Sequence, residues 1–193
     1  MTGSHAHRMR NGGGYGTTAG AADWDVKFAV PLATHLVSRR WLHARLTAGL
    51  GSCCTLIAAP AGWGKTLLAG SWLAEGGPGR AAAWVSLGPS EDDVRALWTA
   101  IATAIIPIVG ERAAADLRHI VSDEDVETVP GQVAAVLADD ATPVVLVLDN
   151  LHEITSLAVH ESLLRLVQRP PIGLRFVATT RRDPPWPLDR LRL

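Results

Sequence analysis

The chain has 193 residues, 48% of them hydrophobic, so it can build a core and does not have the composition of a disordered polymer. Its 18 basic and 19 acidic side chains give a formal net charge of -1, which provides no electrostatic case for nucleic-acid binding by this chain. No run reaches the roughly 20 apolar residues of a membrane span, and no apolar stretch follows the N-terminal basic residues as in a secretory signal. These features predict a cytoplasmic protein, and the adjacent Cys53 and Cys54 fit a reducing compartment as two small apolar strand residues.

The first 22 residues are rich in glycine, serine and threonine, which predicts a flexible tail before a single domain at residues 23–193. A short apolar segment at residues 27–32 follows, and Pro31 disfavours a helix there. Residues 39–50 are predicted to form a helix, because leucines recur every four residues at Leu42, Leu46 and Leu50.

From residue 53 onward, apolar runs of strand length alternate with helical patterns. The predicted strands are residues 53–59, 82–87, 143–149 and 174–180, and the predicted helices are residues 66–73, 91–106, 111–121, 129–138 and 158–167. In the helix at 66–73 we expect Leu67, Leu68 and Trp72 to point inward, and Ser90 is the expected N-cap of the helix at 91–106. The alternation predicts an α/β fold, a three-layer sandwich with a mostly parallel sheet covered on both faces.

A glycine-rich segment joins the first predicted strand to the next helix. It reads Ala59-Pro60-Ala61-Gly62-Trp63-Gly64-Lys65-Thr66 and matches the phosphate-loop pattern G-x-x-x-x-G-K-[ST], except that Ala59 holds the first glycine position. In such a loop the glycines bring backbone N–H groups close to phosphate oxygens, Lys65 contacts the β- and γ-phosphates, and the Thr66 hydroxyl ligates magnesium. We therefore predict that Ala59, Pro60, Ala61, Gly62, Trp63, Gly64, Lys65, Thr66 and the following Leu67 bind the nucleotide. The alternative, a chance glycine turn, leaves the lysine–threonine pair without a packing role.

The second motif is a run of four apolar residues that ends in an acid, at residues 145–149. Asp149 would lie at the carboxyl edge of a parallel sheet, face the phosphate loop and hold magnesium directly or through water. The alternative is an acid that only caps a buried strand. Many P-loop ATPases place a second carboxylate after the first, but this chain has Asn150, which orients water and cannot take a proton. We therefore expect slow turnover.

The third motif, at residues 176–181, is a strand that ends in two threonines and an arginine. Arg181 is the candidate sensor of the γ-phosphate, because a guanidinium forks onto phosphate oxygens, and Arg182 is a weaker substitute. Lys65, Asp149 and Arg181 form the predicted catalytic set. For His152 two interpretations stay open, contact with the γ-phosphate or plain packing, whereas Glu153 is expected to point elsewhere.

Taken in order, these segments resemble the N-terminal ATPase domain of the large ATP-binding LuxR-type transcription regulators, the MalT-like group of STAND ATPases. The resemblance implies ATP and Mg²⁺ as cofactors, a switch that ATP turns on and ADP resets, and an adenine-side segment near residues 30–39 with Val37 and Arg39 at the nucleotide. It rests on Lys27-Phe28 with Val30-Pro31, Leu36-Val37-Ser38-Arg39, residues 58–66, Trp84-Val85-Ser86-Leu87, residues 146–152 and residues 178–188.

Two departures from the family pattern shape the expectations. The family has two acids where this chain has Asp149 and Asn150, and it continues with a further strand, a winged helix, helical repeats and a DNA-binding domain. We therefore expect a partial domain whose phosphate-loop strand has an exposed edge, with ATP or ADP and self-association as partners and no direct DNA contact. Alternatives are a free-standing small P-loop ATPase or kinase, or a truncated remnant without function.

Overall fold

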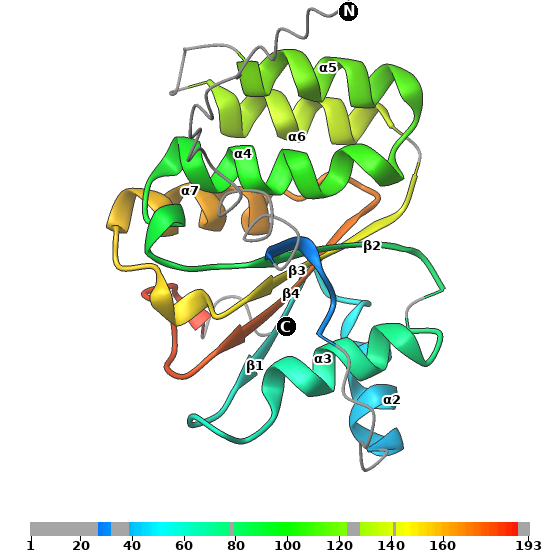
Figure 1. The fold of residues 1–193 in the computed structure, drawn as a ribbon, viewed down its shortest axis with the longest axis vertical. Coiled ribbons are helices and arrows are strands. Elements are labelled where there is room, and N and C mark those ends of the chain that lie inside the picture. Colours follow the sequence, from blue (N-terminus) through cyan, green and yellow to red (C-terminus); the bar gives the residue numbers. More distant parts are fainter. Residues whose placement is uncertain (1–26, 32–38, 78, 123–127, 141, 189–193) are drawn as a thin grey trace, which may run out of the picture.

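The structure is a computed structural model that describes residues 27–31, 39–77, 79–122, 128–140 and 142–188. The predicted tail at residues 1–22 lies outside the described residues, so the proposed domain boundary stays a prediction. Strands and helices alternate along the chain as expected (Figure 1). In order, the elements are α2 (Arg40–Gly49), β1 (Cys54–Ala58), α3 (Lys65–Ala74), β2 (Ala81–Ser86), η1 (Pro89–Glu91), α4 (Val94–Ile105), η2 (Ile106–Ile108), α5 (Glu111–Ser122), α6 (Val129–Asp139), β3 (Val144–Asp149), η3 (Leu151–Glu153), α7 (Leu157–Gln168) and β4 (Leu174–Thr180).

The strands form one parallel sheet in the order β1-β4-β3-β2. Parallel neighbours need crossover connections, which the helices supply. In the described part of the chain, β1 pairs with β4 alone and lies at one edge of the sheet. Within the described residues, β1 is therefore an edge strand, and its predicted exposure stays a prediction.

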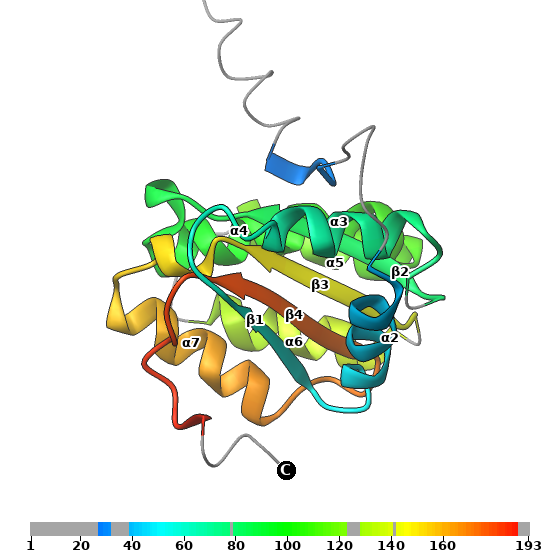
Figure 2. The same cartoon turned by 90° about the horizontal axis from the view of Figure 1, so that it is seen from below.

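Helices cover both faces of this sheet (Figures 1 and 2). Successive side chains of a strand point to opposite faces. In β3, Leu146 and Leu148 pack in the core under α4 and α7, whereas Val145 and Val147 pack with Trp72 on the side of α2 and α3. Every residue of β3 is buried, which explains why its sequence is a continuous apolar run. The expected three-layer α/β sandwich is confirmed.

Two details of the helices differ from the prediction. The helix predicted from residue 91 begins at Val94, and its N-cap is Asp93, whose carboxylate accepts the Ala96 N–H at 3.0 Å. Ser90 is not the cap, because its hydroxyl donates to the Glu91 carboxylate at 2.8 Å within the short η1 turn.

The prediction of which α3 side chains point inward is also wrong for one residue, Leu67. Trp72 is buried and Leu68 packs beside it, but Leu67 is 37% exposed. Leu68 and Trp72 lie one helical turn apart on the same face, whereas Leu67 is rotated about 100° from Leu68. None of the helices in the described ranges is long and apolar enough to cross a membrane.

Candidate functional site

The register of the sheet brings the three sequence motifs together at the C-terminal ends of the parallel strands. Ala58 at the end of β1 is the partner of Thr180 at the end of β4, and the Ala59 N–H donates to the Thr180 carbonyl at 3.2 Å. Asp149 is the last residue of β3, at this same end of the sheet, and its register partner is Ser86 at the end of β2. The phosphate loop, the acid and the segment that carries Arg181 are therefore neighbours, although they are far apart in the sequence.

The loop between β1 and α3 contains two glycines with left-handed backbone conformations. Gly62 and Gly64 have φ values of 78° and 75°, a left-handed conformation that glycine adopts without strain. A Cβ at either position would meet nothing within 4 Å, so the backbone conformation, not crowding, selects glycine. Gly64 is the N-cap of α3 and supplies no side-chain cap, which leaves the N–H groups of the first turn available to an anion.

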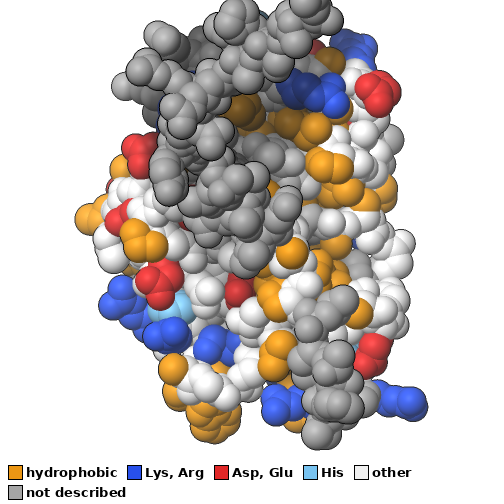
Figure 3. Space-filling model, viewed as in Figure 1, with side chains coloured by type: hydrophobic (Ala, Val, Ile, Leu, Met, Phe, Trp, Pro, Cys, Tyr) orange, Lys and Arg blue, Asp and Glu red, His pale blue; other side chains and the backbone are white. Residues whose placement is uncertain are grey.

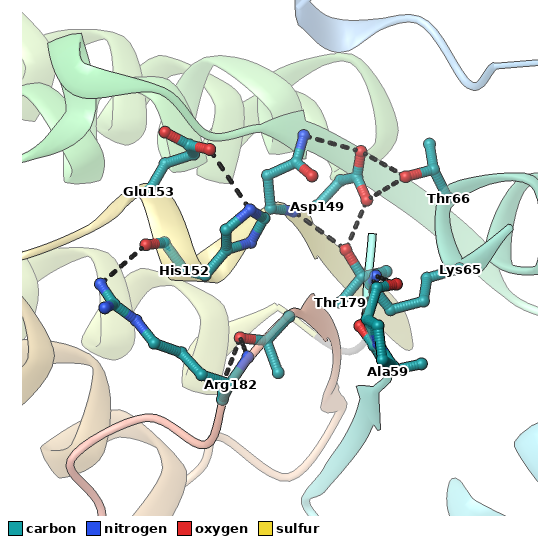
Figure 4. Close-up of polar contacts among 11 residues, drawn as sticks. Ala59, Lys65, Thr66, Asp149, His152, Glu153, Thr179 and Arg182 are labelled. Carbon is teal, nitrogen blue, oxygen red and sulfur yellow. Dashed lines mark hydrogen bonds and ion pairs between the residues drawn. The ribbon is translucent and has the colours of Figure 1, made fainter. Parts of the chain in front are cut away.

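Lys65 begins α3 and is folded onto its own loop. Its side chain is largely buried, and Nζ donates to the carbonyls of Ala59 at 2.7 Å and Pro60 at 2.9 Å (Figure 4). Both acceptors are neutral. A phosphate oxygen is a stronger acceptor for an ammonium, because a charge-assisted hydrogen bond is roughly twice as strong as a neutral one.

Thr66 and Asp149 meet across 83 positions of sequence. The Thr66 hydroxyl lies 2.9 and 3.1 Å from the two carboxylate oxygens of Asp149, to which it donates (Figure 4). Asp149 is only 2% exposed. One hydroxyl and one carboxylate are a fitting donor set for Mg²⁺, which prefers oxygen ligands and keeps several waters. No group of three or more His, Cys, Asp or Glu side chains that could hold a metal ion occurs among the residues described.

Thr179 is a member of the site that sequence reasoning missed. Its buried hydroxyl donates to the Asp149 carboxylate at 2.5 Å and accepts the Asn150 N–H at 2.9 Å. The Asn150 amide also donates to the Asp149 carboxylate, at 3.3 Å. The available signal was position, since Thr179 stands one residue before the end of β4, level with Asp149.

Asn150 has an unusual backbone. Its φ of 63° places it in the left-handed region, and among the described residues it is the one non-glycine residue there. Asparagine and aspartate tolerate this conformation better than other side chains, because their short polar groups bond locally. Asn150 thus turns the chain from β3 into η3.

Of the other predicted residues, Arg181 and Arg182 follow β4, and Arg39 precedes α2. Arg181 follows β4 directly and is exposed, and the Arg182 guanidinium donates to the His152 carbonyl at 3.4 Å. The Arg39 guanidinium makes a long contact, 3.5 Å, to the Trp63 carbonyl of the loop. Val37 lies outside the described residues. The nucleotide contacts predicted for Val37, Arg39, Leu67 and Arg181 stay predictions.

His152 lies beside the cluster with its imidazole nearly enclosed. Its side chain is 8% exposed, and neither ring nitrogen has a hydrogen-bond partner in the described structure. Nε2 lies 3.2 Å from a Glu153 carboxylate oxygen, a contact that becomes an ion pair only if the ring is protonated. Burial lowers the pKa of His152, as do the positive charges of Arg181, Lys65 and Arg182, while Glu153 acts against the shift.

The strand order, the glycine loop between β1 and α3 and the acid at the end of β3 together define a P-loop NTPase fold. No protein-family model matches the chain. It is 26% identical over 161 residues to the HTH-type transcriptional regulator MalT from two strains of Klebsiella pneumoniae, strain ATCC 700721 / MGH 78578 and strain 342. The matches cover 82% of this chain and 18% of each relative, so the chain spans under a fifth of the length of these curated relatives. The similarity to MalT-like regulators predicted from the sequence is confirmed.

Chains in two solved structures can be aligned with part of this chain. A chain in the structure of Drosophila ORC bound to AT-rich DNA and Cdc6 aligns with a TM-score of 0.46 and 13% identity, over 74% of this chain and 46% of that one. Caenorhabditis elegans PCH-2 aligns with a TM-score of 0.44 and 11% identity, over 79% of this chain and 39% of that one. The fold assignment rests on the strand order and loop of this chain itself.

Proposed function

We propose that this chain binds ATP with Mg²⁺ through its phosphate loop and acts as the nucleotide-dependent switch module of a transcription regulator. The observation that carries the proposal is the contact of 2.9 Å between the Thr66 hydroxyl and the Asp149 carboxylate. This contact brings a hydroxyl oxygen and a carboxylate oxygen together at the start of α3, directly after Lys65, and magnesium accepts both kinds of oxygen as ligands.

Each residue of the cluster has a defined task in this proposal. The loop N–H groups and the first turn of α3 hold the α- and β-phosphates. Lys65 transfers its hydrogen bonds from the Ala59 and Pro60 carbonyls to the β- and γ-phosphate oxygens. Thr66 and Asp149 would hold Mg²⁺, which would neutralise negative charge on the phosphates. Arg181 closes the site from the end of β4.

Slow hydrolysis follows from the residue after Asp149. A general base must accept a proton from the attacking water, and the Asn150 amide cannot do so. Its N–H₂ group instead donates to Asp149. We therefore assign the chain long-lived triphosphate binding with weak ATPase activity, which suits a switch better than an enzyme of metabolism.

The proposed regulatory role is supported by the similarity to the HTH-type transcriptional regulator MalT, which extends over most of this chain. We assign no DNA contact to the chain, because its formal charge is -1. Exchange of ATP for ADP and self-association are the partner events we propose, and the open edge of β1 is a surface where self-association can occur.

Isothermal titration calorimetry with ATP, with and without Mg²⁺, tests the proposal. Lys65→Ala should weaken ATP binding by about 10- to 100-fold, the loss expected for hydrogen bonds to a charged group. Arg112→Ala, which removes an equal charge from an exposed site on α5, is the matched control and should bind as the wild type does. Equal affinities for the wild type and Lys65→Ala, or binding that ignores Mg²⁺ in both the wild type and Thr66→Val, would contradict it.

A further inference from the structure

A second cavity lies where α4, α6 and α7 pack together, on the side of the sheet that α4 and α7 cover. Its volume is about 610 Å³, and small-molecule sites span roughly 300–1,000 Å³. The walls are the first half of α6, the C-terminal half of α7 and the buried Trp98 of α4. No residue of the phosphate loop or of the Asp149 cluster lines this cavity, so it is a separate place on the molecule.

The cavity exists because the α6 wall consists largely of small residues, among them Gly131, Ala134 and Ala135. Gly131 does not have a left-handed φ, and a Cβ at this position would meet nothing within 4 Å. Neither the backbone conformation nor crowding therefore selects glycine, although glycine is less favourable than alanine inside a helix. Glycine here leaves the α6 backbone open to a molecule that fills the cavity.

The charge of the lining is one-sided. Figure 3 shows acidic and basic side chains interspersed over one face of the molecule, in keeping with the formal net charge of -1. The cavity lining instead holds Arg165 and Arg169 and no acidic residue. The two arginines lie one helical turn apart on α7, where like charges repel and destabilise a helix. Neither forms an ion pair with the residues that the structure describes, so a bound anion would relieve this repulsion.

The other polar groups of the lining divide into satisfied and unsatisfied ones. The Trp98 indole N–H donates to the Ser162 hydroxyl at 3.0 Å, and this hydroxyl donates to the Val159 carbonyl at 2.7 Å. The Gln132 amide oxygen, by contrast, is buried without a hydrogen-bond partner in the described part of the chain. Thr128 makes no side-chain cap at the start of α6, which leaves N–H groups of the first turn as donors at the positive end of the helix dipole.

We propose that this cavity binds a small organic carboxylate with a flat apolar body. The carboxylate lies between Arg165 and Arg169, whose guanidinium groups fork onto its two oxygens, and near the positive end of α6. The apolar body lies against Trp98, Leu166 and the small residues of α6. Inorganic phosphate would satisfy the arginines but leave the apolar part of the cavity unfilled. This site does not depend on the proposed nucleotide binding, because the two share no residue.

Isothermal titration calorimetry of the full chain with 2-naphthoate and with 2-naphthamide tests the proposal. The two probes share the ring system and nearly the same shape, but only 2-naphthoate carries a charge. It should therefore bind at least about tenfold more tightly than the amide. Arg165→Gln and Arg169→Gln should each weaken binding of 2-naphthoate by about tenfold. Arg112→Gln, which removes an equal charge from an exposed site on α5, is the matched control and should bind as the wild type does.

A second variant tests the location of the site. Gly131→Leu places a side chain in the cavity and should abolish binding of 2-naphthoate, while the midpoint of thermal unfolding should not fall, because a Cβ at this position has free space. The proposal is overturned if 2-naphthoate does not bind, if acid and amide bind equally, or if Arg165→Gln and Arg169→Gln bind as Arg112→Gln does. Arginines that serve only the dipole of α7 would give such a result. The comparison of acid and amide needs only the wild type, so it decides the question if a variant does not fold.

Discussion

Asp149 accepts hydrogen bonds from three side chains, those of Thr66, Thr179 and Asn150. A carboxylate that is 2% exposed needs such partners, because an unpaired buried charge is costly. The network also fixes the direction in which the carboxylate points, toward the first turn of α3. The same hydrogen bonds that stabilise the buried carboxylate thus hold in position the oxygens that we propose as Mg²⁺ ligands.

The residue after Asp149 offers a test of slow turnover. Asn150→Asp should keep the fold, because aspartate also tolerates a φ of 63°, and it supplies the missing carboxylate. Steady-state ATP hydrolysis should rise by about 100-fold, the lower range for general acid–base catalysis. Asn150→Gly, which keeps the turn without a side chain, is the matched control and should stay as slow as the wild type. Equal rates in all three proteins would show that Asn150 does not limit hydrolysis.

Local sequence was sufficient to single out Lys65, Thr66 and Asp149 as candidates, because each stands at a fixed offset in a motif, and the structure brings Thr66 and Asp149 into contact. Thr179 was not predicted, because its role depends on the register between β3 and β4, which no local pattern specifies. His152 could be singled out, but only the structure shows that its ring is enclosed and lacks partners.

At the scale of elements, the strands were the most predictable parts. β3 is buried on both faces, so its apolar run is continuous and its end at Asp149 is unambiguous. Helix starts were harder to place. Ser90 and Asp93 are both good N-caps by residue type. Ser90 lies inside the short η1 turn, where the Glu91 side chain accepts the Gly88 N–H at 3.0 Å, and α4 begins only after this turn.

The cap of α4 is directly testable. Asp93→Ala should lower the free energy of unfolding by about 1 kcal/mol, because it leaves the Ala96 N–H without its acceptor. Ser90→Ala should cost less, since the Ser90 hydroxyl bonds only to Glu91 among the residues described. Urea unfolding of both variants gives the comparison, and a larger loss for Ser90→Ala would contradict the assignment of the cap.

At the scale of the whole molecule, alternation of strands and helices predicted the layers, and the family resemblance predicted an open edge at β1. The order β1-β4-β3-β2 places β4 between the phosphate-loop strand and the strand of Asp149. Thr179 near the end of β4 therefore reaches Asp149 at the end of β3, and Arg181 follows directly after β4. This order follows from long-range pairing, which is why composition and periodicity alone did not give it.

Two buried histidines make stability depend on pH. Burial lowers the pKa of His160 below its ordinary value of 6.5, and the pKa of His152 is lowered for the same first reason. The unfolded chain therefore binds more protons than the folded one below about pH 6.5, and stability should fall as pH drops from 6.5 through the folded-state values. Thermal unfolding across this range should show a smaller loss in His160→Gln. The exposed His119→Gln is the control, and an unchanged slope in His160→Gln would contradict this account.

Hydrogen exchange of the backbone amides with and without Mg-ATP is the most direct test of the phosphate loop. If loop N–H groups hold the phosphates, the amides of residues 61–66 should exchange more slowly with Mg-ATP, and this protection should vanish in Lys65→Ala. Amides of α5, which packs on α4 and α6 away from the loop, should not change. Binding of Mg-ATP without protection of residues 61–66, or with protection elsewhere only, would contradict the claim that this loop binds the triphosphate.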